Sequence, residues 1–231
     1  MLNFEYYGHS AFLLDDGKYK LLFDPFLTGN PTASIKADEV KADYVLVTHA
    51  HGDHIGDALA IVKRTGAAAI GIPEVLELIQ KVAPNSTGYG MNIGGALGFP
   101  FGKVFITPAL HSSGVAGGAP VGFIVAIGGM NVYFAGDTGL FPYMSFIGKR
   151  IKIDVAILPI GDNYTMGVED AAEAVKLLGA RHVIPVHYNT WPVIEQDPAE
   201  FKRLAESASS AKIHIVKPGG SLELTALDGV V

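Results

Sequence analysis

The chain has 231 residues, of which 49% are apolar, a net charge of −6 and an isoelectric point near 5.7. This length suits one large domain or two small ones, and the apolar content is enough for a sizeable core. The negative charge, without a long Lys/Arg cluster, argues against nucleic acid as a partner. No apolar run reaches the roughly 18 residues of a membrane span. The absence of cysteine excludes disulfides and thiolate ligands, and the first residues lack a secretion signal, so we expect a cytoplasmic protein.

The chain begins with a β-meander. Apolar runs bounded by turn residues predict three short strands, Leu2–Tyr7, Ser10–Asp15 and Tyr19–Asp24. His9 lies between two of these strands, where a histidine can serve the structure or contact a substrate. Asp24 precedes Pro25, so it either forms a turn or directs a carboxylate toward a site. Residues 25–41 are irregular and polar, and they are long enough to form a lid or a pocket wall.

The segment VLVTHAHGDH is the most informative part of the sequence. Asp43–Thr48 predicts a strand, and three histidines and an aspartate follow it directly: His49, His51, Asp53 and His54. On an extended backbone His49 and His51 project to the same side, and Gly52 allows a sharp turn. Imidazole and carboxylate are ligands of Zn²⁺, Mn²⁺ and Fe²⁺, so the loop predicts a metal site. The alternative is a solvated polar loop without metal.

Helices and strands alternate after this loop. The pattern predicts a helix, a strand, a second helix and then a Gly-rich region of turns or irregular strands, at Ile55–Thr65, Ala67–Gly71, Pro73–Val82 and Asn85–Gly102. Such alternation indicates α/β layering.

Two further candidates follow strands in the middle of the chain. A strand at Lys103–Leu110 ends at His111, just before a Gly/Ser loop. A hairpin, Val121–Ile127 with Asn131–Ala135, ends at Asp137, which stands between glycines that allow close backbone approach. Taken singly, His111 could be an incidental loop residue and Asp137 a turn residue. Together with the first loop they predict a shared site.

The last part of the chain repeats the strand and helix alternation. The predicted elements are a strand at Asp154–Ile160, a helix at Val168–Leu178, a strand at His182–Val186, a helix at Pro198–Ser207 and a final hairpin of Lys212–Val216 with Ser221–Thr225. His187 directly follows a strand, whereas His182 and His214 are interpreted as structural residues. No linker divides the chain, so we expect a single domain over residues 1–231, built from two similar halves with the site between them.

Seven side chains at the carboxyl ends of strands form the predicted site: His49, His51, Asp53, His54, His111, Asp137 and His187. Because Zn²⁺ is usually four-coordinate, seven ligands suit two metal ions rather than one. One ion would lie near His49, His51 and His111. The other would lie near Asp53, His54 and His187, with Asp137 bridging the two.

The pattern His-x-His-x-Asp-His, a distant His, Gly-Asp-Thr and a last His resembles the metallo-β-lactamase-fold superfamily. Residues 8–14 and 159–166 resemble its branch of uncharacterised metal-dependent hydrolases, similar to ascorbate-6-phosphate lactonases and N-acylphosphatidylethanolamine phospholipases D. The resemblance implies an α/β fold, a four-layer αββα sandwich of two pseudo-symmetric halves with the metals at one edge. It assigns metal-ligand roles to the seven residues and a supporting role to Asp24. By analogy it also suggests a homo-oligomer.

The function predicted from these features is metal-dependent hydrolysis of a small anionic ester: a phosphoester, a phosphodiester or a phosphorylated lactone. Two cations would turn a bridging water into hydroxide, and Asp53 would also move a proton. His9, Asn163 and Thr165 are the candidate substrate contacts. Zn²⁺ is the first expectation, with Mn, Fe or Ni as alternatives. The competing hypotheses are a metal-dependent nuclease or RNA-processing enzyme and a non-catalytic metal-binding protein.

Overall fold

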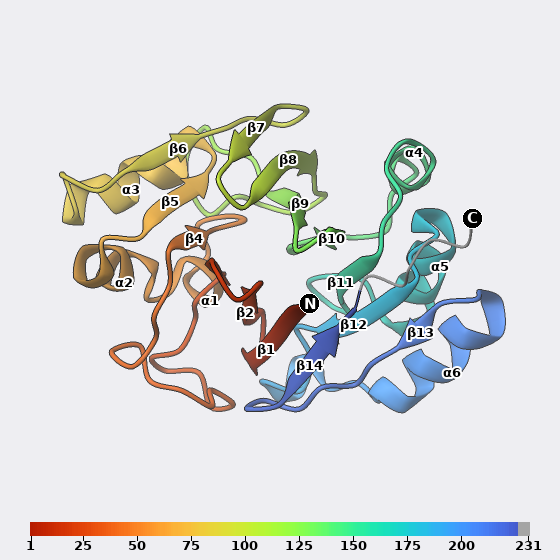
Figure 1. Ribbon diagram of the computed structural model, residues 1–231. Coiled ribbons are helices and arrows are strands. Elements are labelled where there is room, and N and C mark those ends of the chain that lie inside the picture. Colours follow the sequence, from red (N-terminus) through yellow and green to blue (C-terminus); the bar gives the residue numbers. More distant parts are fainter. Residues whose placement is uncertain (226–231) are drawn as a thin grey trace.

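A computed structural model describes residues 1–225 and shows two seven-stranded sheets with helices on both sides (Figure 1). Helices α1 to α3 lie beside the first sheet and α4 to α6 beside the second. Their bounds are α1 Gly52–Ile55, α2 Ala58–Thr65, α3 Pro73–Val82, α4 Tyr143–Arg150, α5 Val168–Leu178 and α6 Pro198–Ala208, with a short 3-10 helix at Pro192–Ile194. The predicted αββα sandwich is therefore confirmed. In the part of the chain that the structure describes, no helix is long and apolar enough to cross a membrane.

The first sheet has the strand order β14-β1-β2-β3-β4-β5-β6. Its strands are β1 Leu2–Gly8, β2 Ala11–Asp15, β3 Lys20–Phe23, β4 Tyr44–Leu46, β5 Ala68–Gly71, β6 Gly88–Gly90 and β14 Ser221–Leu224. The pairings from β14 to β3 are antiparallel, and those from β3 to β6 are parallel.

The second sheet has the order β13-β12-β11-β10-β9-β8-β7. Its strands are β7 Ala96–Phe99, β8 Gly102–Pro108, β9 Val121–Ile127, β10 Met130–Phe134, β11 Val155–Pro159, β12 His182–Val186 and β13 Lys212–Ile213. Here too an antiparallel meander, β7 to β10, is followed by parallel strands, β10 to β13. The two halves therefore repeat one plan.

Aromatic side chains join the two sheets in a common core. Phe12 of β2 stacks on Phe23 of β3 with ring centroids 4.5 Å apart, and both rings pack edge-on against Phe134 of β10, across the interface. A second apolar cluster, which includes Val175 and Phe201, fills the space between the second sheet and α4 to α6. Both inner and outer faces of the parallel strands are covered, which explains why β11 is wholly apolar and buried.

The strand directions bring one edge of each sheet to the site. From the pairings, β1, β3 and β4 run in one direction in the first sheet, and β8, β10, β11 and β12 run in one direction in the second. The carboxyl ends of these strands precede all of the candidate residues. Ligands in open α/β sheets bind outside the carboxyl ends of strands.

Several expectations about local structure were wrong. Residues 212–216 and 221–225 do not form a hairpin, because β13 pairs in parallel with β12 whereas β14 crosses to the other sheet and pairs with β1. The helix expected at Ile55–Thr65 is broken at Gly56, which has φ +33°. A Cβ there would meet Pro25 O at 2.6 Å, so the chain passes too close for any other residue. Helix α4 has no counterpart in the sequence-based prediction.

Candidate metal centre

Three histidines form the first half of the site. His49 Nε2 lies 2.9 Å from His51 Nδ1, and His111 Nε2 lies 3.3 Å from the same nitrogen. His49 and His51 follow β4, whereas His111 follows β8 in the other sheet. Burial, followed by the neighbouring imidazole of His54, lowers the pKa of His49 to about 2, so its ring is neutral. A neutral imidazole is the form that binds a metal ion.

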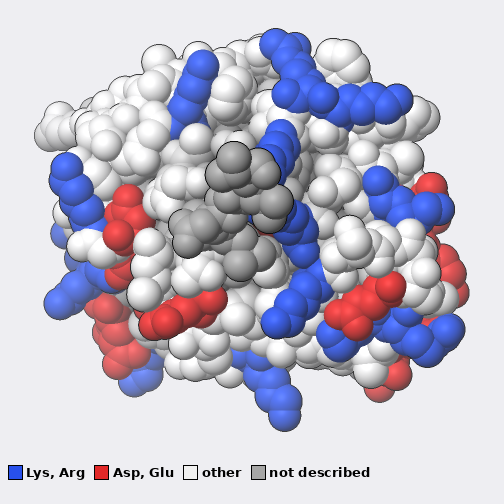
Figure 2. All heavy atoms as spheres, turned by 45° about the vertical axis from the view of Figure 1, so that its right-hand side comes forward, with Lys and Arg blue, Asp and Glu red and all other residues white. Residues whose placement is uncertain are grey.

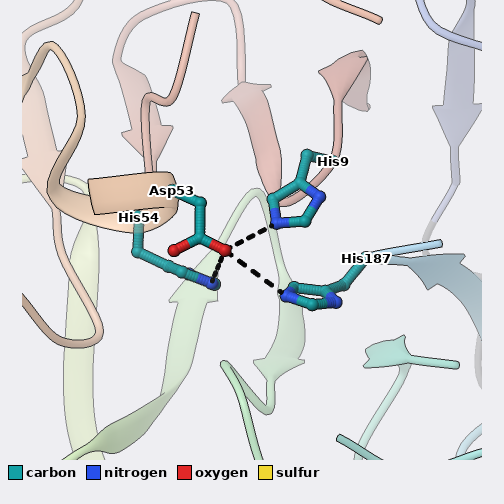
Figure 3. Close-up of side chains that lie close together, drawn as sticks. All are labelled: His9, Asp53, His54 and His187. Carbon is teal, nitrogen blue, oxygen red and sulfur yellow. Dashed lines mark hydrogen bonds and ion pairs between the residues drawn. The ribbon is translucent and has the colours of Figure 1, made fainter. Parts of the chain in front are cut away.

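Asp53, His54 and His187 form the second half of the site, and His9 lies close enough to belong to the same cluster (Figure 3). Asp53 Oδ2 lies 4.0 Å from His54 Nε2 and 3.9 Å from His187 Nε2. Asp53 and His54 belong to α1, and His187 follows β12. Burial alone would raise the pKa of Asp53, but the hydrogen bond from His9 and the nearby His54 outweigh it and hold that pKa well below its usual value.

Asp137 lies between the two groups. Its Oδ2 is 3.2 Å from both His54 Nε2 and His187 Nε2, and 3.5 Å from His111 Nε2. Burial opposes ionisation of this carboxyl, but His54 and His187 keep its pKa well below the usual value. The backbone can reach this position because Gly136 has φ +63°, and a Cβ there would meet Val121 O at 2.8 Å. The predicted close approach beside Asp137 is therefore confirmed.

Asp24 fixes the ring orientation of two of the histidines. Thr48 Oγ1 donates to Asp24 Oδ2 at 2.6 Å and so has only lone pairs for His49 Nδ1, which donates to it at 2.9 Å. His54 Nδ1 donates to the same Asp24 oxygen at 2.7 Å. In both rings Nε2 therefore faces the site. Such carboxylate partners orient the metal-ligating histidines of known sites.

Unpartnered buried atoms show that the site suits a metal ion. His54 Nε2, both ring nitrogens of His187 and Asp137 Oδ1 have no hydrogen-bond partner among the described residues. Burial would lower the pKa of His54, but Asp137 and Asp24 raise it well above its usual value. Buried polar atoms normally have partners, so the unpartnered Nε2 atoms of His54 and His187, each 3.2 Å from Asp137 Oδ2, fit a metal-binding role.

His9 lies behind Asp53 and is almost completely buried. Its Nε2 is 3.2 Å from Asp53 Oδ2 and its Nδ1 is 2.8 Å from Thr190 Oγ1 (Figure 3). Burial lowers its pKa to about 4 despite the hydrogen bond to Asp53. His9, Asp24 and His187 all have positive φ, between 38° and 57°, in the left-handed region. Non-glycine residues persist there only when surrounding contacts hold them, and such residues cluster at functional sites.

One detail of the metal loop differs from expectation. Gly52 does not adopt a positive φ, and it begins helix α1 instead of a sharp turn. A Cβ at this position would meet no atom within 4 Å. The one-turn helix, not the freedom of glycine, therefore separates His51 from Asp53 and His54.

A cavity of about 860 Å³ opens onto the two groups. Beside ligand candidates its wall contains Phe26, Tyr164, Trp191 and Val193. Phe26 lies in the loop at 25–41, which was expected to be a lid or pocket wall. Asn163 and Thr165 flank Tyr164 but are not among the lining residues, and His9 is shielded behind Asp53. Their role as substrate contacts stays a prediction.

The aromatic wall was missed in the sequence. A signal was present, because the only Trp of the chain stands four residues after His187. A large apolar side chain in a loop beside a polar site is unusual enough to mark a pocket.

Comparisons with known proteins agree with this geometry. A family model described as a beta-lactamase superfamily domain matches residues 19–188. A protein of Pelotomaculum thermopropionicum, named a UPF0173 metal-dependent hydrolase, is 50% identical over 225 residues, covering 94% of this chain and 97% of the relative. A protein of the same name from Thermococcus kodakarensis is 48% identical, covering 97% of this chain and 100% of the relative.

A solved structure of a related protein has a fold similar to that of this chain. Igni18, described as a novel metallo hydrolase from the hyperthermophilic archaeon Ignicoccus hospitalis, superposes with a TM-score of 0.89 at 43% identity. The match covers 97% of this chain and 99% of Igni18. Together with the family model and the relatives, this structural match shows that the chain belongs to the metallo-β-lactamase superfamily and is a metal-dependent hydrolase.

Proposed function

We propose that the protein hydrolyses a small anionic ester, a phosphoester, phosphodiester or phosphorylated lactone, with two divalent metal ions held by the seven clustered residues. One ion would be held by His49, His51 and His111, the other by Asp53, His54 and His187, with Asp137 shared. The observation that carries the proposal is the set of buried, unpartnered ligand atoms that converge from both sheets. Zn²⁺ is the first candidate, and Mn, Fe and Ni are alternatives because they accept the same nitrogen and oxygen ligands.

Bound divalent ions would lower the pKa of a water toward 7 and stabilise developing negative charge. The chain's own residues complete this chemistry. Asp53 is the carboxylate of the second group that faces the cavity, and its side chain is 28% exposed. Asp53 would also move a proton, because its partly exposed carboxylate presents acceptor oxygens to the cavity. His9 donates to Asp53 from behind and limits its rotation.

The net charge of the chain favours a small substrate over nucleic acid. On the face shown in Figure 2, Lys and Arg side chains are spread from top to bottom and over both sides, and Asp and Glu side chains lie among them on the left and right. The chain as a whole has a net charge of −6. Proteins that bind nucleic acid need a basic surface, and their binding weakens steeply with salt. A salt titration with single-stranded RNA and DNA would test the competing nuclease hypothesis.

The proposed function is tested by metal reconstitution. Protein stripped with a chelator should not hydrolyse phosphomonoesters, phosphodiesters or phosphorylated lactones. Reloading separately with Zn²⁺ and Mn²⁺ should restore turnover of at least one class. His51→Ala and His187→Ala should each abolish it. His182→Ala is the matched control, because this histidine lies outside the site and pairs with His214. Full turnover by His51→Ala would exclude the proposed centre.

A further inference from the structure

Part of the cavity wall is formed by apolar and aromatic side chains: Phe26, Tyr164, Trp191 and Val193. Trp191 and Phe26 lie with ring centroids 6.0 Å apart at an interplanar angle of 33°. Both rings pack edge-on against His9, with ring centroids 4.9 Å away for Trp191 and 5.8 Å away for Phe26. The contact with this buried ring restricts the orientation of both side chains. Tyr164 and Val193 lie on the same wall and are 54% and 51% exposed.

These four side chains come from three separate segments. Phe26 follows β3, Tyr164 follows β11, and Trp191 and Val193 follow β12. Their convergence on one cavity is therefore a product of the fold and not of a local apolar run. Apolar side chains left exposed around a concave polar site mark a surface that binds an apolar partner group.

Among the residues that the structure describes, no cationic Lys or Arg side chain would add to the charge of metal ions bound in this cavity. None of its lining residues, all within the described part of the chain, is Lys or Arg. Its charged protein groups are the carboxylates of Asp53 and Asp137. A phosphomonoester carries a charge of about −1.5 to −2 at neutral pH, and beyond the metal ions it would find no Arg or Lys partner among these lining residues for its second negative charge. A diester carries a single negative charge, which leaves its other oxygen substituents free to be apolar.

We propose that the substrate is a phosphodiester with at least one aryl or comparably bulky apolar ester group, which lies against Phe26 and Trp191 while the phosphate faces the metal ligands. This rests on the proposed hydrolytic function. The reaction consumes one water: a new P–O bond forms to the water oxygen, and the P–O bond to one ester group breaks. The products are the released alcohol and a phosphomonoester, with the second proton of water passing to solvent. The dianionic product should bind less tightly than the substrate, because the apolar wall, as far as the structure describes it, has no Lys or Arg to pair with its second negative charge.

Binding can be measured apart from turnover, because Trp191 is the only Trp of the chain and lines the cavity. The zinc-loaded protein is titrated with diphenyl phosphate, dimethyl phosphate and phenyl phosphate, by Trp fluorescence and by calorimetry. Comparing the three probes separates the effect of the aryl groups on affinity from the effect of the phosphate charge. Diphenyl phosphate should bind at least tenfold more tightly than either of the others, since aromatic rings bury large apolar surfaces. Phe26→Ala should weaken diphenyl phosphate about tenfold.

The matched control is Phe146→Ala, which removes an aromatic side chain that is 47% exposed on α4 and does not line the cavity. It should leave all three affinities unchanged. Equal affinity for dimethyl and diphenyl phosphate, tighter binding of phenyl phosphate, or no binding of diphenyl phosphate would overturn the inference.

Kinetics separate this inference from the proposed function. Bis(p-nitrophenyl) phosphate and methyl p-nitrophenyl phosphate release the same leaving group and differ only in the second ester group. The bis-aryl ester should have a KM at least tenfold lower, and Trp191→Ala should remove most of this difference. Selective binding of diphenyl phosphate without hydrolysis of either ester would refute the proposed function and leave the binding specificity intact. Hydrolysis of both esters with equal KM would refute the specificity alone.

Discussion

At the scale of single residues, Asp24 decides which nitrogen of two histidines faces the site. It accepts from Thr48 N at 2.8 Å, from Thr48 Oγ1 and from His54 Nδ1, and it is fully buried. The carboxylate presents only acceptors, so every neighbouring group must donate to it. His54 Nδ1 must therefore carry its proton toward Asp24. Because Thr48 Oγ1 also donates to Asp24, it can only accept from His49 Nδ1, which must carry a proton as well. A residue that touches no cavity thus sets the chemistry of residues that do.

The variant Asp24→Asn tests this role, because asparagine has the same shape but places two N–H donors in the network. The Asn amide would face the N–H of His54 and favour the wrong tautomer, with its proton on Nε2. Metal affinity, measured by competition with a chelator, should fall by about 10- to 100-fold. Asp57→Asn is a suitable control, since Asp57 accepts only from the backbone of Leu27 and Thr28. Unchanged affinity in Asp24→Asn would disprove the tautomer argument.

The residues of the candidate site could be predicted because histidine and aspartate side chains at this spacing after a strand are typical of metal sites. Histidines spaced two apart after an apolar strand, followed by Asp and His, have a side-chain chemistry that suits metal ions. The supporting contacts could not be predicted. The hydrogen bond from His9 to Asp53 joins residues 44 positions apart, and that from the Thr190 hydroxyl to His9 joins residues 181 apart. Only the folded sheet edges bring them together.

At the scale of elements, close backbone approach between β11 and β12 positions His187. A Cβ on Gly161 would lie in steric conflict with His187 O, and 3.1 Å from Ile194 Cβ. His187 N donates to His9 O at 2.8 Å, so its backbone cannot retreat without losing this bond. Glycine at 161 therefore allows the loop after β12 to reach the site.

Gly161→Ala should displace His187 and lower kcat/KM at least tenfold. It should also cost about 1–3 kcal/mol of unfolding free energy, as overpacking of a tight contact does. Chemical denaturation and metal analysis would measure the two effects. Gly98→Ala in β7 is the control, because its Cβ would meet nothing within 4 Å, and it should change stability by less than about 0.5 kcal/mol. Wild-type values for Gly161→Ala would contradict the steric argument.

His214 and His182 connect β13 to β12 away from the site, with His182 Nδ1 2.9 Å from His214 Nε2. Burial, His182, Lys212 and Lys202 lower the pKa of His214 to about 4, and Glu206 opposes them only in part. The unfolded chain takes up this proton near pH 6.5, before the folded chain does. Stability linked to His214 is therefore complete above about pH 6.5 and declines as the pH falls toward 4.

His214→Gln should make the free energy of unfolding less dependent on pH between about 6.5 and 4. The difference should be on the order of 1 kcal/mol, because the ring is half exposed and solvent screens its neighbours. Urea unfolding of both proteins at several pH values would measure it. Parallel stability curves for the two proteins over this interval would show that the native pKa of His214 is not lowered.

Elements with strong periodicity were predicted well, and their long-range partners were not. The apolar strand at 155–159 and the helix at Val168–Leu178 match the structure closely. The expected hairpin near the C-terminus failed because Pro218-Gly219-Gly220 also suits a crossing between sheets. Local turn chemistry is the same in both cases, and only the pairing of β14 with β1 distinguishes them.

At the scale of the whole molecule, the site depends on both sheets. His49, His51, Asp53 and His54 follow the first sheet, and His111, Asp137 and His187 follow the second. The repeated plan of meander and parallel strands was visible in the sequence as an echo between the halves. The sequence does not show how the carboxyl ends of the strands in the two sheets come to face each other. That arrangement depends on the packing of rings such as Phe12 and Phe134 across the interface between the sheets.

The central claim is that both groups of ligands hold metal and that hydrolysis needs both. Its most direct test is to titrate the metal-free protein with Zn²⁺ while recording bound metal per chain and the rate of phosphodiester hydrolysis. We expect binding to reach two ions per chain, with activity appearing only as the second ion binds. His187→Ala should retain one ion and no activity. Full activity at one ion or fewer per chain, or in His187→Ala, would contradict the account.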